Sequence, residues 1–249
     1  SQAICAGSSV TFSVAATGAG SLSYRWRKNG TPISGEISST LTLTNVSIAD
    51  SGSLYSCVVT DASDSSNPTI SSDATLTVNP IINPGFTQVA SICSGATLAT
   101  LPTTSNNSIT GTWLPALNNT ATTTYTFSPT AGQCATTASM TISVNSLPVL
   151  SPLGTTTTTI CLGQSTTLSV SGAASYLWST GSSSNSITVN PTSNSTYSIT
   201  GTGVNGCTKT ETFTVQVNSL PTITISGNTT ICNGTSTTLN ASGATSYTW

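Results

Sequence analysis

Cysteine is the residue with the most scope for chemistry in this sequence, because seven cysteines occur in a chain of 249 residues that has no histidine. Zinc sites normally draw on histidine or on C-x-x-C pairs, and the sequence contains neither. Disulfide formation in an oxidising compartment is therefore the chemistry that we expect of these thiols. Because the number is odd, at least one cysteine is left as a free thiol or as half of an intermolecular bridge.

A catalytic site is not expected from the remaining polar residues. Activation of a serine or cysteine nucleophile normally needs a histidine base, and glycoside hydrolysis needs two carboxylates across a cleft. Asp61 and Asp64 are close in sequence, but both lie in one predicted loop, TDASDSSNP. A weak calcium site formed by these two residues and Asp73 is the alternative to solvated loop acids. We predict no enzyme activity, no cofactor, no catalytic residue and no metal site.

Charged residues are scarce, and this excludes further classes of function. Only 4% of residues are charged and the net charge is −2, whereas charged residues make up about 25% of an average soluble protein. Nucleic-acid binding is not expected, because no basic surface is available to neutralise phosphates. No apolar run approaches the ~20 residues of a membrane span, so membrane insertion is not expected either.

A short phrase, Ile-Cys-x-Gly, recurs along the chain and marks a repeat. It lies at Ile4–Gly7, Ile92–Gly95, Ile160–Gly163 and Ile231–Gly234. We call the cysteine of this phrase the first cysteine of its unit. A tryptophan follows each phrase, and a second cysteine closes each of the first three units, whose last segments end in Asn79, Asn145 and Asn218. The tryptophans are Trp26, Trp113, Trp178 and Trp249, and the second cysteines are Cys57, Cys134 and Cys207.

Repeats of this length indicate whole domains in tandem rather than a solenoid. We predict domains at residues 1–80, 81–146 and 147–219, followed by the N-terminal part of a truncated fourth domain at residues 220–249. On this division the chain is expected to be part of a longer protein. Cys232 is then expected to be unpaired, because its partner would lie after Trp249.

Each unit is predicted to consist of short β-strands. Apolar and polar residues alternate with period two, as in residues 212–217, and clusters of Asn, Gly, Ser and Pro separate the segments. About seven short strands with a tryptophan between two cysteines are typical of an immunoglobulin-like sandwich. Short, proline-bearing linkers favour a semi-rigid arrangement. The predicted fold is all-β, with tandem immunoglobulin-like β-sandwich domains in an extended rod on the order of 100 Å long.

The first unit resembles immunoglobulin I-set domains. The segments VTFSV, YRWRKNGTPI and STLTLTNVSIADSGSLYSC resemble strand B, strands C and C′, and strands E and F. Tyr55, two residues before Cys57, matches the family's tyrosine corner. Val14 stands where the strand-B cysteine of the family would be, and one extra residue separates Gly52 from Tyr55. The family's usual disulfide between strands B and F therefore cannot form here.

The later units, from Ile81 to Trp249, resemble the immunoglobulin-like repeats of very large secreted surface proteins of Bacteroidetes. The resemblance rests on C-x-G followed by GTWLP or YLWSTG, then TTTYTF or NSTYSI, and then GQC or NGC. It implies type IX secretion, an extracellular location at the cell surface, and a role in adhesion, gliding or surface structure. The predicted function is a non-catalytic stalk or fibre of an adhesin or filament. The alternatives are a carbohydrate- or protein-binding module and the accessory region of a secreted enzyme whose catalytic domain lies outside this chain.

Within such a sandwich, the strand that carries the first cysteine lies beside the last strand, so the two cysteines of a unit are expected to meet. We therefore predict the pairs Cys5–Cys57, Cys93–Cys134 and Cys161–Cys207. The four tryptophans are expected in the domain cores rather than on a carbohydrate-binding surface. Phe86 and Phe127 are the aromatic residues that the pattern does not assign to a core.

Association is expected to involve other copies or neighbouring repeats of the same chain. From residue 74 onward the only charged residues are Lys209 and Glu211, and natural sheets usually protect their edges with charge. Self-association into a filament is therefore the favoured expectation, and the alternatives are a glycan coat and a hydroxyl-rich surface that stays monomeric through hydration alone. Triplets of the type N-x-S/T, which this composition produces by chance, include those that start at Asn45, Asn106, Asn118, Asn194, Asn228, Asn233 and Asn240.

Overall fold

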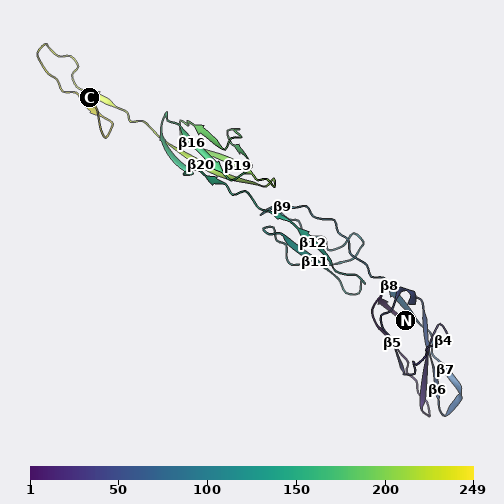
Figure 1. Ribbon diagram of the computed structural model, residues 1–249. Helices are drawn as coiled ribbons and strands as arrows, with labels where there is room; N and C mark the ends of the chain where they lie inside the picture. Colours follow the sequence, from purple (N-terminus) through teal and green to yellow (C-terminus); the bar gives the residue numbers. More distant parts are fainter. The chain divides into compact units, whose positions relative to one another are not determined.

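The computed structural model describes all 249 residues, and nearly all of the regular secondary structure in the chain is β-strand (Figure 1). A single turn of 3-10 helix, η1 (Ile48–Asp50), is the only helical element. The chain divides into two compact units, the first formed by Ser1–Ile92 with Thr97–Ser143 and the second by Cys93–Ala96 with Val144–Trp249. No helix has the length and apolar character needed to span a membrane.

The N-terminal part of the first unit is a sandwich of two sheets. One sheet has the order β1 (Gln2–Cys5), β8 (Ala74–Asn79), β6 (Leu54–Asp61), β3 (Leu22–Lys28) and β4 (Thr31–Pro32), with β7 (Asp64–Ile70) also paired to β6. The other sheet pairs β2 (Val10–Ser13) with β5 (Thr40–Leu43). Strand β1 is parallel to β8, whereas the other pairs are antiparallel.

The core of this sandwich follows from the period-two pattern. In β2, Val10 and Phe12 are buried while Thr11 and Ser13 are exposed. Phe12 stacks on Tyr55 with ring centroids 5.0 Å apart. On the outer face, the hydroxyl groups of Thr11 and Thr42 lie 3.0 Å apart across the two strands. Such cross-strand threonine pairs stabilise a sheet without charge.

The second part of the first unit has a smaller sheet and an aromatic core. The sheet has the order β10 (Gly111–Leu114), β11 (Thr123–Pro129) and β12 (Ala138–Ile142). Phe127 is fully buried, and its ring centroid lies 4.7 Å from that of Phe86 and 5.3 Å from that of Trp113. The two phenylalanines that the sequence left unassigned are therefore core residues. A short pairing of β9 (Ile92–Cys93) with β13 (Val144–Asn145) follows, and Cys93, Val144 and Asn145 of this pair belong to the second unit.

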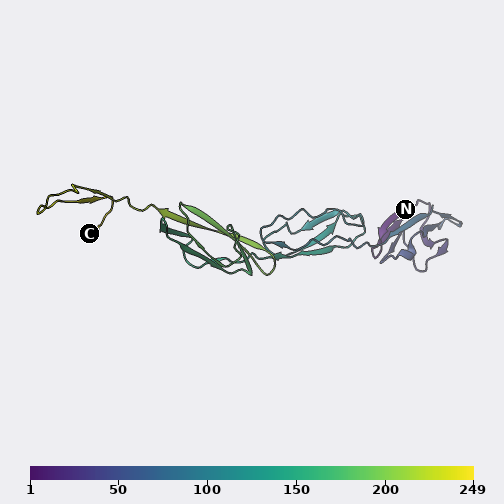
Figure 2. The same ribbon diagram turned by 90° about the horizontal axis from the view of Figure 1, so that it is seen from above.

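Residues 147–218 form a sandwich of two sheets in the second unit (Figure 2). The larger sheet has the order β15 (Thr157–Cys161), β20 (Thr208–Asn218), β19 (Ser195–Thr202) and β17 (Ser175–Trp178). The smaller has the order β14 (Ser151–Pro152), β16 (Thr166–Ser171) and β18 (Ser186–Val189). Strand β15 is parallel to β20, as β1 is to β8. In β20, Phe213 and Val215 point into the core, as the alternation of residues 212–217 indicates.

Residues 219–249 contain one antiparallel hairpin, β21 (Thr224–Ser226) with β22 (Asn240–Ser242). Trp249 is 77% exposed, so its predicted place in a core is wrong for this structure. The physical reason is that a two-stranded hairpin has no facing sheet against which an indole can be buried.

The other three tryptophans share one hydrogen-bonding arrangement. Trp26 and Trp178 are buried, while Trp113 is half-buried at the side of its core. Each indole Nε1–H donates to a backbone carbonyl at 2.9 Å, and the three acceptors are Ser38, Pro102 and Ser184. A buried indole N–H needs such a partner. These tryptophans therefore serve packing.

Candidate functional site

The feature that repeats most closely along the chain is a junction built around the first cysteine of each domain. We define this cysteine junction as the C-x-G turn together with the asparagine that ends the last strand of the same domain. Cys5 lies opposite Asn79 in the β1–β8 pair, and Cys161 lies opposite Asn218 in the β15–β20 pair. The residue after each first cysteine donates its N–H to the asparagine carbonyl at all three complete junctions. These bonds are Ala6 to Asn79 at 2.9 Å, Ser94 to Asn145 at 2.8 Å and Leu162 to Asn218 at 2.9 Å.

The C-x-G spacing has a simple backbone cause. The carbonyls of Cys5, Cys93 and Cys161 each accept a hydrogen bond from the N–H three residues later, at 3.2, 2.9 and 3.0 Å. In each of these turns the third residue is a glycine with a positive φ, between 81° and 86°. This is the pattern of a type II turn, in which the third position favours glycine. The turn ends the strand and holds the cysteine beside the start of the linker.

The structure contains two disulfides, and both join one predicted domain to the next. Cys5 is bonded to Cys134, and Cys93 is bonded to Cys207, with Cα–Cα distances of 5.2 and 5.6 Å. In each case a first cysteine is paired with the second cysteine of the following domain. The predicted pairs Cys5–Cys57, Cys93–Cys134 and Cys161–Cys207 are therefore wrong.

The position of Cys57 explains why it does not reach Cys5. Cys57 lies in the middle of β6, opposite Trp26, and its side chain is fully buried in the core. Cys5 instead ends β1 at the edge of the sandwich. Burial raises the pKa of the Cys57 thiol, and its Sγ lies 3.6 Å from the Val58 carbonyl. Cys57 is therefore an unreactive core residue.

The second cysteines of the next two domains instead lie in turns that the preceding linker passes. The N–H of Ile82 donates to the carbonyl of Cys134 at 2.8 Å, and the N–H of Thr136 donates to the carbonyl of Ile82 at 3.0 Å. The side-chain amide of Asn205 donates to the carbonyl of Ser146 at 2.9 Å, and the N–H of Cys207 donates to the Asn205 amide oxygen at 3.1 Å. Hydrogen bonds thus hold each linker against the turn that carries the second cysteine.

Cys161 and Cys232 have no disulfide partner in this structure, and both are exposed. Cys161 was predicted to pair with Cys207, but Cys207 is bonded to Cys93. The turn after Cys232 has the same form as the others, since Thr235 donates its N–H to the Cys232 carbonyl at 3.1 Å and Gly234 has a φ of 87°.

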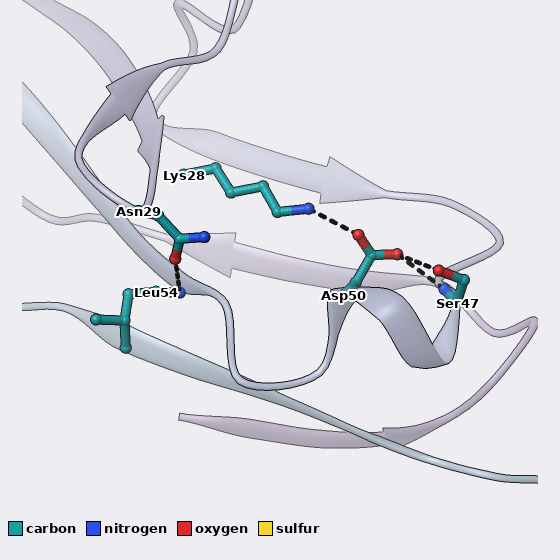
Figure 3. A network of polar contacts seen from close by, with 5 residues as sticks. All are labelled: Lys28, Asn29, Ser47, Asp50 and Leu54. Atoms are coloured by element: carbon teal, nitrogen blue, oxygen red, sulfur yellow. Dashed lines mark hydrogen bonds and ion pairs between the residues drawn. The ribbon is translucent and has the colours of Figure 1, made fainter.

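A polar cluster in the first sandwich fixes the loop before β6 (Figure 3). Lys28 Nζ lies 2.7 Å from Asp50 Oδ1, and the other carboxylate oxygen of Asp50 accepts hydrogen bonds from the Ser47 N–H and hydroxyl, both at 2.9 Å. The hydrogen bond from Lys28, followed by those from Ser47, lowers the pKa of Asp50 to about 2. Asn29 Oδ1 accepts a hydrogen bond from the Leu54 N–H at 2.8 Å. These contacts cap η1 and hold the strand ends, which is a structural role.

The aspartates of the calcium alternative are not brought together as a metal site. Asp61 accepts hydrogen bonds from the backbone N–H groups of Ala19, Gly20 and Ser63, at 2.8, 2.9 and 2.9 Å. The bond from the Ser63 N–H is the first cause of the lowered pKa of Asp61. Asp64 accepts a hydrogen bond from the Ser66 hydroxyl at 2.8 Å. No group of three or more histidine, cysteine, aspartate or glutamate side chains is placed to hold a metal ion.

Comparison with known proteins supports the immunoglobulin-like character of the first domain. Residues 1–61 match the family model described as immunoglobulin domain. No curated protein sequence matches the chain.

Several solved structures of multi-domain immunoglobulin proteins are similar at low identity. An I-band fragment of titin is 14% identical, with 88% of this chain and 95% of that chain covered and a TM-score of 0.41. Immunoglobulin domains 1–4 of Sidekick-1 are 15% identical, with 90% and 73% covered and a TM-score of 0.29. Extracellular domains 3–5 of Drosophila OTK are 16% identical, with 87% and 94% covered and a TM-score of 0.27.

These TM-scores are too low to support an argument about function. The fold follows from the chain itself, with its paired sheets, its parallel strand pairs β1–β8 and β15–β20 and the family match over residues 1–61. The chain is an all-β protein of tandem immunoglobulin-like β-sandwich domains.

Proposed function

We propose that this chain is a non-catalytic, load-bearing region of a bacterial extracellular protein, where it forms part of the stalk or fibre of an adhesin or surface filament exported by type IX secretion. The observation that supports the proposal is the disulfide pairing, because both bridges join successive predicted domains instead of closing one domain. Disulfides persist mainly in oxidising surroundings, which supports an extracellular location.

The two bridges overlap in sequence, and this gives the chain a short covalent route for tension. From Cys5 the route crosses to Cys134, returns along the chain to Cys93, and crosses again to Cys207. If the domains unfold under load, this route becomes fully extended first. The segments from Cys5 to Cys93 and from Cys134 to Cys207 then bear no load. Such an arrangement limits extension, which suits a stalk.

Single-molecule stretching of the whole chain between terminal handles tests this role. At about 3.5 Å per extended residue, the oxidised chain should reach about 30 nm and the reduced chain about 85 nm. The double variant Cys5→Ser/Cys134→Ser should extend about 15 nm further than the oxidised parent, because the first segment then carries load.

Cys57→Ala and Cys161→Ser are the matched controls, and both should reach the same length as the parent. A longer extension for the Cys57 variant would mean that bridges close single domains. An oxidised parent that reaches the full reduced length would contradict the load-bearing proposal.

A carbohydrate-binding role has less support from the side chains. Phe86 and Phe127, the aromatic residues that were free to form a sugar-binding surface, belong to an aromatic core. Glycan-array binding of the whole chain checks this alternative directly. Saturable binding to a defined glycan would favour a binding module over a simple stalk.

A further inference from the structure

Cys161 occupies the same place in its domain as the two first cysteines that are bonded to the following domain. It ends a strand that runs parallel to the last strand of the domain, lies opposite the asparagine that ends that last strand, and is followed two residues later by a glycine with a positive φ. Cys5 has the same three features, with Asn79 as the opposite asparagine. Unlike Cys5 and Cys93, Cys161 is exposed and has no disulfide partner.

The linker after Cys161's domain repeats the linker that serves a known bridge. Residues 145–148 and residues 218–221 are both Asn-Ser-Leu-Pro. At the first of these linkers, the Asn145 carbonyl lies 3.9 Å from Cys207 Sγ, and the Ser146 carbonyl accepts a hydrogen bond from Asn205. The same four residues after Asn218 would lead a following domain past Cys161 in the same way.

Cys232 is not the partner that this geometry requires. It is the first cysteine of its own C-x-G turn, and Thr235 donates to its carbonyl as at the other turns. The bonded partners of Cys5 and Cys93 are both second cysteines, found in turns of the next domain.

We propose that Cys161 is a disulfide site whose partner is the second cysteine of an immunoglobulin-like domain that follows residue 219 in the native protein. The two thiols together lose two protons and two electrons. A small-molecule or protein disulfide takes up these electrons and is reduced to two thiols, with a mixed disulfide as the intermediate. This inference rests on the repeated junctions and is independent of the stalk proposal.

A tandem duplication within the whole chain tests the inference with this protein's own residues. A second copy of residues 146–218, inserted directly after Asn218, recreates the Asn-Ser-Leu-Pro linker and supplies a second copy of Cys207 downstream of Cys161. The chain is oxidised in a mixture of oxidised and reduced glutathione, then denatured and alkylated, and free thiols are counted by intact mass. The duplicated chain is expected to have three free thiols, the same number as the parent chain.

Two matched variants identify which cysteine is bonded. Cys161→Ser in the upstream copy should release one further thiol, because the downstream copy of Cys207 loses its partner. Cys161→Ser in the downstream copy should remove one free thiol. If the upstream variant instead loses one free thiol and the downstream variant gains one, the cysteines pair within the inserted domain, and the proposal is overturned. Two additional free thiols in the duplicated chain would also overturn it.

Two further readouts make the result decisive. Cys93→Ser in the duplicated chain should release one thiol, which reports that the inherited bridge to Cys207 has formed and that the domain is folded. Formation of that bridge while the upstream Cys161 remains free would contradict the proposal. Disulfide-linked dimers on a non-reducing gel, formed through Cys161, would also overturn it in favour of pairing between two chains.

Discussion

Cys5 and Cys134 are separated by 129 positions in the sequence, yet their Cα atoms lie 5.2 Å apart across a disulfide. Cys5 ends a strand of the first sandwich, and Cys134 lies in a turn of the next predicted domain beside Ile82. The bridge therefore couples the stability of two domains that the sequence pattern treats as separate.

Removal of this bridge should weaken both domains. The chain-entropy model gives an upper value of about 5 kcal/mol for a loop of this length. We expect Cys5→Ser/Cys134→Ser to lower the unfolding midpoint in guanidinium, as followed by tryptophan fluorescence. Cys161→Ser, which removes an exposed free thiol, is the control and should leave the midpoint unchanged. Equal midpoints for the double variant and the parent would show that the bridge does not contribute to stability.

The glycine of the C-x-G turn should be sensitive to substitution for backbone reasons alone. Gly95 has a φ of 82°, and a Cβ added there would meet no atom within 4 Å. Gly95→Ala should therefore cost about 1–2 kcal/mol, which is the penalty of a left-handed conformation for alanine. Gly85 also has open space but no positive φ, so Gly85→Ala is the matched control. Thermal unfolding of the two variants measures the difference, and similar losses would contradict the assigned turn.

Asp50 should make stability depend on pH in the acid range. Its folded pKa is lowered to about 2 from 3.8, so its contribution is present above about pH 4 and is lost as pH falls toward 2. Asp50→Asn should destabilise the first sandwich by on the order of 1 kcal/mol at pH 7 and by less at pH 2. Asp64→Asn, at an exposed carboxylate that begins β7, is the control. A loss that is the same at both pH values would argue against the ion pair with Lys28.

Between about pH 4 and 9 the unfolding midpoint should change little, because few groups titrate there. The pKa of the Cys57 thiol is raised by burial, so this group remains protonated through that range. Salt should have a small effect as well, since Lys28–Asp50 is the only ion pair. Thermal scans across pH and sodium chloride concentration check this, and a strong dependence on either would indicate electrostatic interactions not present in the structure.

Self-association should occur through uncharged sheet edges. Strand β17 lies at the edge of its sheet, and it carries Leu177, which is 57% exposed. A lysine on such an edge is a common natural barrier to pairing. We expect sedimentation of the whole chain to show concentration-dependent association, which Leu177→Lys weakens. Val204→Lys, at an exposed loop position, is the matched control, and an equal effect of both variants would indicate that added charge, not the edge, matters.

The strands and the cores could be predicted from the sequence because they depend on local patterns. Alternation in β2 and β20 matches the buried and exposed faces. Trp26 and Trp178 are buried where the spacing indicates. Phe86 and Phe127 could not be assigned, since their contact joins a loop to a strand far along the chain.

The disulfide pairs could not be predicted from the same patterns. Pairing depends on where the linker leads the next domain, and hydrogen bonds such as those of Ile82 and Asn205 control this. One signal was available in the sequence, because Cys57 lies at an inward position of a strand while Cys134 and Cys207 lie in turns. That difference separates a core thiol from two thiols at domain ends.

The overlap of the two disulfides has a consequence for damage to the backbone. A single proteolytic cut between Cys5 and Cys93 leaves the fragments joined through Cys134, and a cut between Cys134 and Cys207 leaves them joined through Cys93. A cut between Cys93 and Cys134 is spanned by both bridges. Any one nick from Cys5 to Cys207 therefore leaves the molecule in one covalent piece, and the two sides of that single cut separate only after the bridges that span it are reduced.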